Sequence, residues 1–330
     1  MTGSDAGSDA GVVLVIADAS DATSDAVCAV LAERGVEVFR FDTAEFPARL
    51  QLDARLEGAW WSGDLVRGEE RLDLARVRSA YVRRPRPFEV PAHLTAAERW
   101  HAATESRYGL GGVLTSLPVR YLNHPSRAAD AAYKPRQLRD LQACGLTVPP
   151  TLVTNSAQAL RRFARRHGPL ICKSIAASVL HTGDTAHVVY TRRVTDAELH
   201  EPGGLDFAAH LFQPFVESTH AIRLTVVGQV FHAVRIDAGS DRARTDWRSD
   251  YDSLTYEVIE LPEQTRVTVA AYMRLSGLHY GAFDFLVGPD GSLTTLEINP
   301  EGNFSWIEEE TKLPITASIV DFLTGDNPPC

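Results

Sequence analysis

The chain has 330 residues, which is enough for two or three packed domains. Hydrophobic residues make up 44% and charged residues 23% of it, a composition typical of soluble globular proteins that excludes collagen, coiled-coil and mostly disordered chains. The net charge is -10 and no dense basic run occurs, so we expect no nucleic-acid partner, because duplex binding needs clustered cations.

The first residues and the cysteines indicate the compartment. Residues 1–11 are small, polar and acidic, which predicts a disordered tail and not a signal peptide. No run approaches the roughly 20 apolar residues that span a bilayer, so no membrane partner is expected. The four cysteines form no C-x-x-C pair, which indicates neither a zinc site nor a disulfide framework. We therefore expect a cytoplasmic protein.

The pattern of the first third of the chain predicts an α/β domain. An apolar β-branched strand at 12–17, a helix ending at Gly35 and a strand at 36–41 predict a small parallel sheet. Between residues 51 and 84, short strands with turns, including 59–61 and 80–83, predict antiparallel additions.

The pattern then continues to a domain boundary near Asn123. A helix is expected at 95–116, with Glu98 at the capping-box position, and a strand follows at 119–122. Beyond the boundary the expected helices are 126–144, 156–167, 263–276 and 315–323. The expected strands are 170–174, 211–216, 221–227, 229–237, 254–259, 280–287 and 293–298.

Lysine is rare in this chain. Of the 33 basic residues, only Lys134, Lys173 and Lys312 are lysine. In such an arginine-rich composition, a lysine is suspected of standing where a compact ammonium group is needed. The alternative is that the three lysines are present by chance and have no special role.

Three oxygen-bearing side chains, those of Asp284, Glu297 and Asn299, are predicted to share one sheet face. Alternation along 293–300 puts Thr295, Glu297 and Asn299 together, and turns Leu296 the other way. If the hairpin register sets Asp284 opposite Thr295 or Glu297, the oxygens converge and suit Mg²⁺. A solvated sheet face carrying acids is the alternative.

Phosphate binding would need positive partners from separate elements, since neither G-x-x-x-x-G-K-[ST] nor G-x-G-x-x-G occurs. Lys134, inside the helix after the boundary, and Lys173, at a strand end, could clamp the phosphates of a nucleotide. For Lys173 the alternative is an edge-strand lysine turned to solvent. The segment 211–217 could present its backbone to an adenine edge, although it could equally be an ordinary buried strand.

Three arginines stand in or beside apolar strands: Arg223, Arg235 and Arg248. An arginine is seldom buried without an anion or acid partner. Bidentate guanidinium groups suit a phosphoryl group or an acyl phosphate. The alternative is an ion pair with Asp237 or Glu217.

Together, this order of lysines, arginine strands and acids resembles the ATP-grasp ligases over residues 123–325. The resemblance extends to the microviridin-type graspetide synthetases, which mature ribosomal peptides with ω-ester or ω-amide rings. Four stretches carry it: Y-V-R-R-P (81–85), R-L-T-V-V-G (223–228), D-W-R (246–248), and E-I-N-P-E-G-N-F (297–304), which continues to W-I-E (306–308) and L-P-I (313–315).

The resemblance implies an α/β (α+β) ATP-grasp fold in three parts: a pre-ATP-grasp domain at 12–122, a small central domain at 123–204 and a C-terminal antiparallel domain at 205–330. It implies ATP and Mg²⁺ as cofactors. The nucleotide would be held by Lys134, Lys173, Gln213, Phe215, Val216 and Glu217. The metal would be held by Asp284, Glu297 and Asn299. Catalytic neutralisation of the phosphoryl group would fall to Arg223, Arg235 and Arg248, and attraction of an acidic peptide to Arg83, Arg84 and Arg86.

The implied reaction activates Asp or Glu side chains of a precursor peptide as acyl phosphates and joins them to Ser or Thr hydroxyls, or to a Lys amine. The partner would be a precursor with a leader and an acidic, hydroxyl-rich core, and the enzyme would be a homodimer. Residues 187–194 are a candidate edge for adding a leader strand. The alternatives are a glutathione-synthetase-like ligase for free amino acids or small peptides, and a non-catalytic nucleotide-binding protein.

Overall fold

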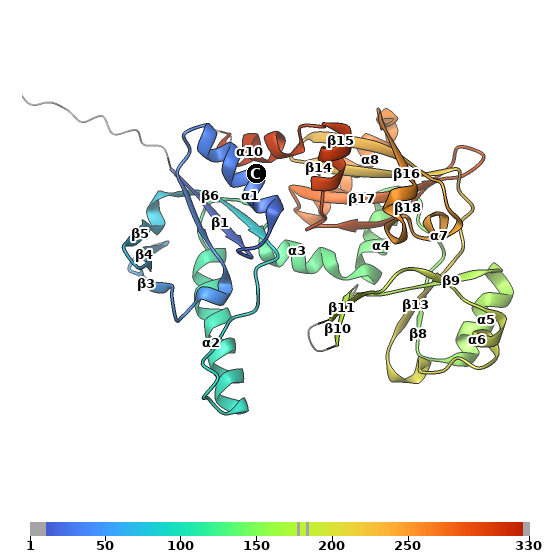
Figure 1. Ribbon diagram of the computed structural model, residues 1–330, viewed down its shortest axis with the longest axis horizontal. Helices are drawn as coiled ribbons and strands as arrows, with labels where there is room; N and C mark the ends of the chain where they lie inside the picture. Colours follow the sequence, from blue (N-terminus) through green and yellow to red (C-terminus); the bar gives the residue numbers. More distant parts are fainter. Residues whose placement is uncertain (1–10, 177–178, 183–184, 326–330) are drawn as a thin grey trace, which may run out of the picture. The chain divides into compact units, whose positions relative to one another are not determined.

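The computed structural model describes residues 11–176, 179–182 and 185–325. The chain divides into two compact units, shown in Figure 1. Unit 1 comprises Met1–Arg127, Leu278–Tyr280 and Pro314–Cys330, and unit 2 comprises Ala128–Gly277 and Gly281–Leu313. The tail expected at 1–11 lies, apart from Gly11, outside the described residues. The further division of unit 2 into a central and a C-terminal domain stays a prediction.

Unit 1 is built on the expected parallel sheet. Its strand order is β2-β1-β6-β7, with β1 (Val12–Ala17), β2 (Val38–Phe41), β6 (Val77–Arg83) and β7 (Arg120–Leu122). Every residue of β1 is buried, as its continuous apolar run predicts. The helices of this unit are α1 (Ala22–Glu33), α2 (Ala96–Thr115) and α10 (Ile315–Thr324). The capping box of Thr95 and Glu98 at the start of α2 is confirmed.

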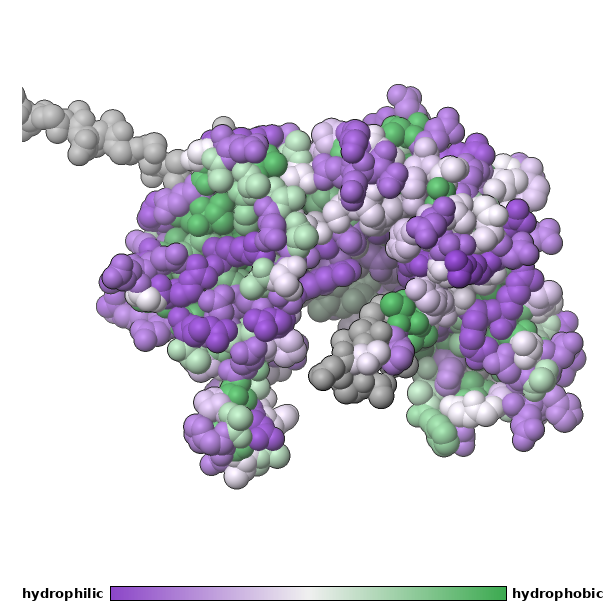
Figure 2. Space-filling view, in the orientation of Figure 1, coloured by the Kyte–Doolittle hydropathy of each residue, from purple (hydrophilic) through white to green (hydrophobic). Residues whose placement is uncertain are grey.

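The position of β6 differs from what the sequence pattern predicted. Residues 80–83 belong to β6, which pairs in parallel with β1, and not to the antiparallel additions. Five of the seven β6 residues are buried, and a strand covered on both faces suits the parallel sheet. The antiparallel additions form a separate sheet of β3 (Gln51–Leu56), β4 (Trp61–Arg67) and β5 (Glu70–Asp73). Hydrophilic side chains predominate over this sheet in Figure 2.

The single helix expected at 126–144 is two helices, α3 (Pro125–Ala132) and α4 (Lys134–Ala143). Pro135 explains the break, because proline has no N–H to give to the Ala131 carbonyl and fits the first turn of a helix. Gln137 Nε2 donates to the Ala131 oxygen instead, at 2.8 Å. Lys134 is therefore the first residue of α4 and does not lie inside a longer helix.

One sheet of unit 2 has the order β12-β9-β13-β8. Its strands are β8 (Leu152–Thr154), β9 (Leu170–Lys173), β12 (Arg192–Arg193) and β13 (His210–Pro214). Helix α5 (Ala157–His167) packs Leu160 against Leu170 and Phe212, and α6 (Asp196–His200) follows β12. A hairpin of β10 (Val179–Thr182) and β11 (Thr185–Val188) stands between β9 and β12 in the chain.

The second sheet of unit 2 has the order β16-β15-β14-β17-β18. Its strands are β14 (His220–Val227), β15 (Val230–Ala238), β16 (Leu254–Ile259), β17 (Tyr280–Val287) and β18 (Leu293–Asn299). Gly228, at φ 58°, makes the expected tight turn between β14 and β15. The remaining helices are α7 (Asp241–Thr245), α8 (Glu263–Ser276) and α9 (Ser305–Thr311). Short 3₁₀ turns lie at Thr43–Glu45, Leu74–Arg76, Leu205–Phe207, Trp247–Ser249 and Tyr251–Ser253.

Within the described ranges, no helix combines the length and the apolar character needed to cross a bilayer.

A buried amide ties α4 to β18. Gln137 is 2% exposed, and its side chain both donates to the Ile298 carbonyl at 2.7 Å and accepts from the Ile298 N–H at 3.0 Å. Ile298 stands between Glu297 and Asn299, so this amide fixes the backbone on which two of the expected metal ligands stand.

We predict that Gln137→Met lowers the free energy of unfolding by about 3 kcal/mol, because the Ile298 and Ala131 backbone groups lose buried partners. Equilibrium unfolding in urea measures the loss. The matched control is Gln142→Met, at an exposed position of the same helix, which should change stability by less than about 0.5 kcal/mol. Equal stability of the two variants would contradict the role given to the buried amide.

Candidate active site

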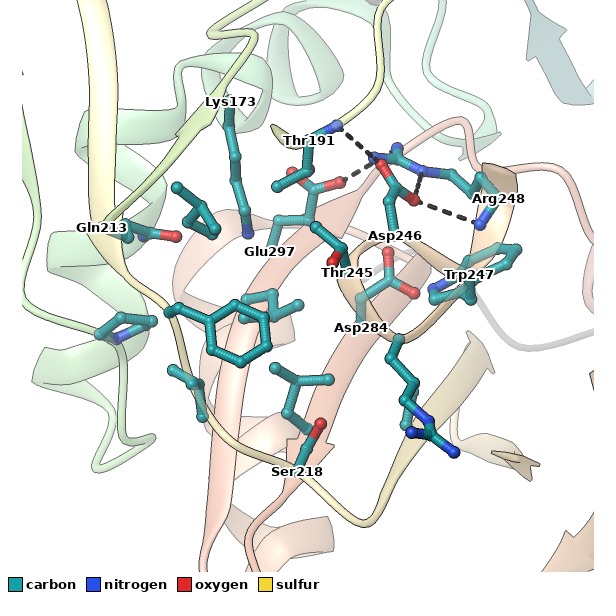
Figure 3. A pocket seen from close by; sticks show the side chains of 18 of the residues that line it. Lys173, Thr191, Gln213, Ser218, Thr245, Asp246, Trp247, Arg248, Asp284 and Glu297 are labelled. Carbon is teal, nitrogen blue, oxygen red and sulfur yellow. Dashed lines mark hydrogen bonds and ion pairs between the residues drawn. The ribbon is translucent and has the colours of Figure 1, made fainter. Parts of the chain in front are cut away.

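A pocket in unit 2 gathers residues from the two larger sheets of this unit (Figure 3). Lys134 comes from the start of α4, Lys173 from the end of β9 and Gln213 from β13. Asp284 and Glu297 come from the neighbouring strands β17 and β18. The turn that carries D-W-R, residues 246–248, also lines the pocket.

Two carboxylates face one another at the floor of this pocket. Asp284 is the register partner of Glu297, one of the two pairings anticipated from the sequence, and each residue is 7% exposed. Burial raises the pKa of Asp284, although the Arg223 guanidinium opposes it. Burial also acts to raise the pKa of Glu297, but Lys134, Lys173 and Arg248 outweigh it and lower that pKa. The pair therefore depends on the cations around it.

A β-bulge changes the expected alternation along β18. The register shifts after Asp284, so that Phe285 faces Thr295 and Leu296 is the extra residue. Leu296 and Glu297 consequently both line the pocket, whereas alternation predicted Leu296 on the opposite face. Thr295 is 1% exposed and is not among the lining residues.

The two lysines contact the carboxylates differently. Lys134 Nζ lies 2.9 Å from Glu297 Oε2 and donates to the Ser174 carbonyl at 2.9 Å. Lys173 extends into the pocket, and burial lowers the pKa of its ammonium group while Glu297 counteracts the effect. Two of the three lysines thus converge on one site, as their rarity suggested.

Two of the three expected arginines also reach this site: Arg248 lines the pocket, and Arg223 contacts it through Asp284. Arg223 is 5% exposed, and its Nη1 donates to both oxygens of Asp284 at 3.0 Å. Arg248 makes a two-bond pair with Asp246 at 2.8 Å and 2.8 Å and lies 3.9 Å from Glu297 Oε1. Burial opposes the charge of Arg248, yet Asp246 raises the pKa of the guanidinium. Asp246 also accepts from the Thr191 N–H, which fixes the carboxylate.

Other expected site residues lie outside the lining. Arg235 makes a two-bond ion pair with Asp237, the alternative that the sequence left open. Phe215 and Val216 line the pocket, whereas Glu217 is exposed and does not. Asn299 does not line it either, but its Nδ2 donates to Glu297 Oε1 at 3.3 Å.

The three arginines expected to attract a peptide belong to unit 1. Arg83 is 3% exposed, and its Nε lies 3.0 Å from Asp21, the N-cap residue of α1. Arg86 Nε lies 2.6 Å from Asp42, while Arg84 is exposed and has a positive φ of 44°. The structure therefore gives Arg83 a structural contact, and a role for the three in peptide binding stays a prediction.

The most specific motifs pack against each other. The rings of Trp247, from D-W-R, and Trp306, from W-I-E, lie 5.0 Å apart between centroids. Tyr251 and Tyr256 contact Trp306 at 5.6 Å and 5.5 Å. The aromatic cluster fixes the turn that carries Arg248.

Sequence reasoning missed Gln137 and Thr151, which position other site residues. Gln137 lies one helical turn after Lys134, and i, i+3 spacing puts the two on one helix face, so this signal was available. Thr151, whose hydroxyl accepts from Gln213, gave no such signal, since the contact joins residues 62 positions apart.

The residues present fit a magnesium nucleotide. Two carboxylates and a nearby amide supply hard oxygen donors, and two lysines and two arginines supply positive charge for phosphates. Among the described residues, no group of three or more His, Cys, Asp or Glu side chains is placed to hold a metal by itself. Such a site suits Mg²⁺, which keeps few protein ligands and shares phosphate oxygens.

Comparisons with known proteins agree with this geometry. The family described as the MvdD pre-ATP grasp domain matches residues 12–129. A RiPP-associated ATP-grasp ligase of Chryseobacterium gregarium, solved with ADP and a leader and core peptide, is 28% identical, with a TM-score of 0.87 over 97% of this chain and 98% of that one. The chain is an ATP-grasp ligase that is similar to those of the microviridin type. No curated protein matches the sequence.

Two macrocyclases of Microcystis aeruginosa MRC are similar to this ligase as well. MdnC, solved with the precursor peptide MdnA, is 26% identical, with a TM-score of 0.84 over 96% of this chain and 100% of that one. MdnB is 29% identical, with a TM-score of 0.79 over 95% and 99%. These likenesses confirm both the ATP-grasp fold and the resemblance drawn from the motifs.

One glycine of the ligase motif E-I-N-P-E-G has no room for a side chain. A Cβ on Gly302 would lie 2.5 Å from the Ala282 Cβ and 2.9 Å from Arg223 Nη2. Arg223 Nη2 donates to the Asn303 carbonyl next to it at 3.1 Å. Glycine is needed here because the guanidinium packs directly against the backbone.

We predict that Gly302→Ala destabilises the ligase by about 1–3 kcal/mol, because Arg223 or β17 must move. Thermal unfolding measures the effect. Gly203→Ala is the control, since a Cβ on Gly203 would meet nothing within 4 Å. Similar melting temperatures for the two variants would show that Gly302 is not sterically required.

Proposed function

We propose that this ligase matures a ribosomally made precursor peptide in natural-product biosynthesis. It activates an Asp or Glu side chain of the peptide as an acyl phosphate and joins it to a Ser or Thr hydroxyl of the same peptide, or to a Lys amine. The observation that carries the proposal is the buried Asp284–Glu297 pair surrounded by Lys134, Lys173 and two arginines. The precursor peptides bound to MdnC and to the Chryseobacterium ligase support the substrate class.

The charges of the pocket favour a polyanionic nucleotide. The lining residues Lys134, Lys173, Arg244 and Arg248 are four cations, and Arg223 adds a fifth beside Asp284. They exceed the three lining carboxylates, which are Asp246, Asp284 and Glu297. A site with excess positive charge and little water attracts phosphates strongly. We therefore propose ATP as the phosphoryl donor.

Asp284, Glu297 and Asn299 would hold Mg²⁺. Bound there, the ion would neutralise the phosphate charge that develops during transfer. Glu297 would exchange its pair with Lys134 for the metal, which frees the ammonium group for a phosphate oxygen. Arg223 would likewise turn part of its charge from Asp284 towards the transferred phosphoryl group.

The reaction needs positioning and charge neutralisation more than a protein nucleophile. A peptide carboxylate oxygen attacks the γ-phosphorus, which gives ADP and the acyl phosphate. The peptide hydroxyl oxygen then attacks the acyl carbon, phosphate leaves, and the hydroxyl loses its proton. Arg248, fixed by Asp246, would stabilise the negative charge on the acyl phosphate. Arg235 lies on the opposite face of the sheet from Arg223 and pairs with Asp237, so we give it no part in this step.

Peptide recognition is assigned to two places. Residues 187–194 include β12, which is an edge strand of its sheet and leaves a side open for strand addition by a leader. Arg84 and Arg86, with Arg83 behind them, would attract the acidic core. We further propose that the enzyme works in the cytoplasm as a homodimer.

The direct test uses a short Thr- and Asp- or Glu-rich peptide encoded next to this gene. With Mg²⁺ and ATP, the full-length enzyme should release ADP, and the peptide should lose the mass of one water molecule per ring. ADP release with single amino acids, and none with the peptide, would instead support a ligase for free amino acids. Nucleotide binding without any turnover would support a binding protein.

We predict that Glu297→Gln abolishes this dehydration by at least about 100-fold, because the neutral amide loses the charge that holds the metal. Circular dichroism should show an intact fold. Glu309→Gln, on the exposed side of α9, is the matched control and should turn over normally. Near-normal activity of Glu297→Gln would remove Glu297 from the metal site.

We predict that Lys173→Met weakens ATP binding by about 10- to 100-fold, because an ammonium group facing the phosphates is lost. Isothermal titration measures the dissociation constant. The control is Lys312→Met, which changes the third lysine, an exposed residue after α9. Unchanged affinity in Lys173→Met would exclude that lysine from the nucleotide site.

A further inference from the structure

One cation of the pocket has no part in the proposed function. Arg244 lines the pocket from α7, which directly precedes the turn that carries D-W-R. The next residue, Thr245, lines the pocket as well and is drawn there with Asp284 and Glu297 in Figure 3. The other cations at this site serve the phosphates and the two carboxylates, so the role of Arg244 is open.

Arg244 is held far more loosely than its neighbour Arg248. Its Nη1 lies 3.4 Å from Asp241 Oδ1, and the two side chains are 64% and 100% exposed. An exposed ion pair of this kind contributes little free energy. Arg248, in contrast, makes two bonds of 2.8 Å with Asp246, whose side chain is 4% exposed. Arg244 can therefore exchange Asp241 for a carboxylate of a ligand at small cost.

The exposure of Arg244 places its side chain at the mouth of the pocket. Arg223, which holds Asp284, is only 5% exposed. Asp284 and Glu297, where the metal and the transferred phosphoryl group would meet, are each 7% exposed. A peptide carboxylate that is to be phosphorylated has to reach this buried floor. Arg244 consequently faces a part of the peptide that stays outside, next to the reacting side chain.

We propose that Arg244 binds a second, non-reacting carboxylate of the peptide, which flanks the Asp or Glu that is activated. A guanidinium group binds a carboxylate through two parallel charge-assisted hydrogen bonds. The bound peptide covers the mouth of the pocket, and the loss of water strengthens such a pair. The net charge of -10 repels an acidic peptide elsewhere on the chain, so a loosely held cation at the entrance favours productive docking. This inference rests on the proposed function, because it assumes a peptide substrate.

The experiment uses the full-length enzyme with Mg²⁺, ATP and the acidic peptide encoded next to this gene. Tandem mass spectrometry of the product identifies the acid that forms the first ring. A second peptide carries an amide, Asn or Gln, in place of the nearest other acid; where the core has a single acid, Glu or Gln is introduced beside it. The wild type should show a KM about five- to tenfold higher for the amide peptide, with kcat changed less than about twofold.

The decisive variant is Arg244→Gln. It should raise the KM of the acidic peptide by a similar factor, and the amide should then add less than about twofold, because the two changes remove the same contact. The dissociation constant of ATP should stay within about twofold of the wild-type value. The KM difference between the two peptides should shrink as salt is added, since ions screen a pair at the mouth. A merely structural effect would not depend on the flanking acid.

Two controls separate the contact from loss of charge and from damage to α7. Arg266→Gln removes an exposed arginine of α8 whose pair with Glu263, at 3.6 Å, has the same i, i+3 spacing, but which does not line the pocket. Its KM should be that of the wild type. Asp241→Asn breaks the pair with Arg244 and keeps the guanidinium, so its KM should be equal to the wild-type value or lower. A KM raised as much as in Arg244→Gln would assign the effect to α7 itself and overturn the inference.

The outcomes distinguish this inference from the proposed function. A wild-type enzyme that neither releases ADP nor dehydrates the peptide would overturn both. Ring formation with an unchanged KM in Arg244→Gln would overturn the inference and leave the ligase proposal intact. Weaker ATP binding in Arg244→Gln, with an undiminished effect of the amide peptide, would place Arg244 at the phosphates and also overturn the inference.

Discussion

The burial of two carboxylates directly opposite one another is the constraint on which the site depends. Asp284 and Glu297 are register partners, and like charges at this spacing in a poorly solvated environment repel each other strongly. Each acid has its own cation: Arg223 holds Asp284, and Lys134 holds Glu297. A buried pair that loses one partner is strongly destabilised, so these cations are required before any ligand arrives. In the proposed function, the same charges would become available for phosphates once a metal bound the carboxylates.

The backbone around the two acids is as constrained as their charges. The Gln137 side chain hydrogen-bonds both backbone groups of Ile298 on β18. The bulge after Asp284 turns Leu296 towards the pocket beside Glu297. An apolar side chain next to the acid reduces its contact with water and strengthens every interaction with nearby cations. Gly302 allows Arg223 to approach the backbone at the other end of the motif. The start of α4, the bulge in β18 and Gly302 therefore set the positions of the two carboxylates and of Arg223.

Much of the fold and part of the site could be predicted from the sequence. The continuous apolar run of β1, the boundaries of β17 and the capping box of α2 follow from local patterns, and the structure has them as expected. The facing of Asp284 and Glu297 was one of two registers left open, because register depends on a turn and a bulge that alternation cannot show. The placement of β6 beside β1 required knowledge of long-range pairing. Arg235 looked equivalent to Arg223 in its strand, but it is the register partner of Ile222 and therefore lies on the opposite face of the sheet from Arg223, beside Asp237.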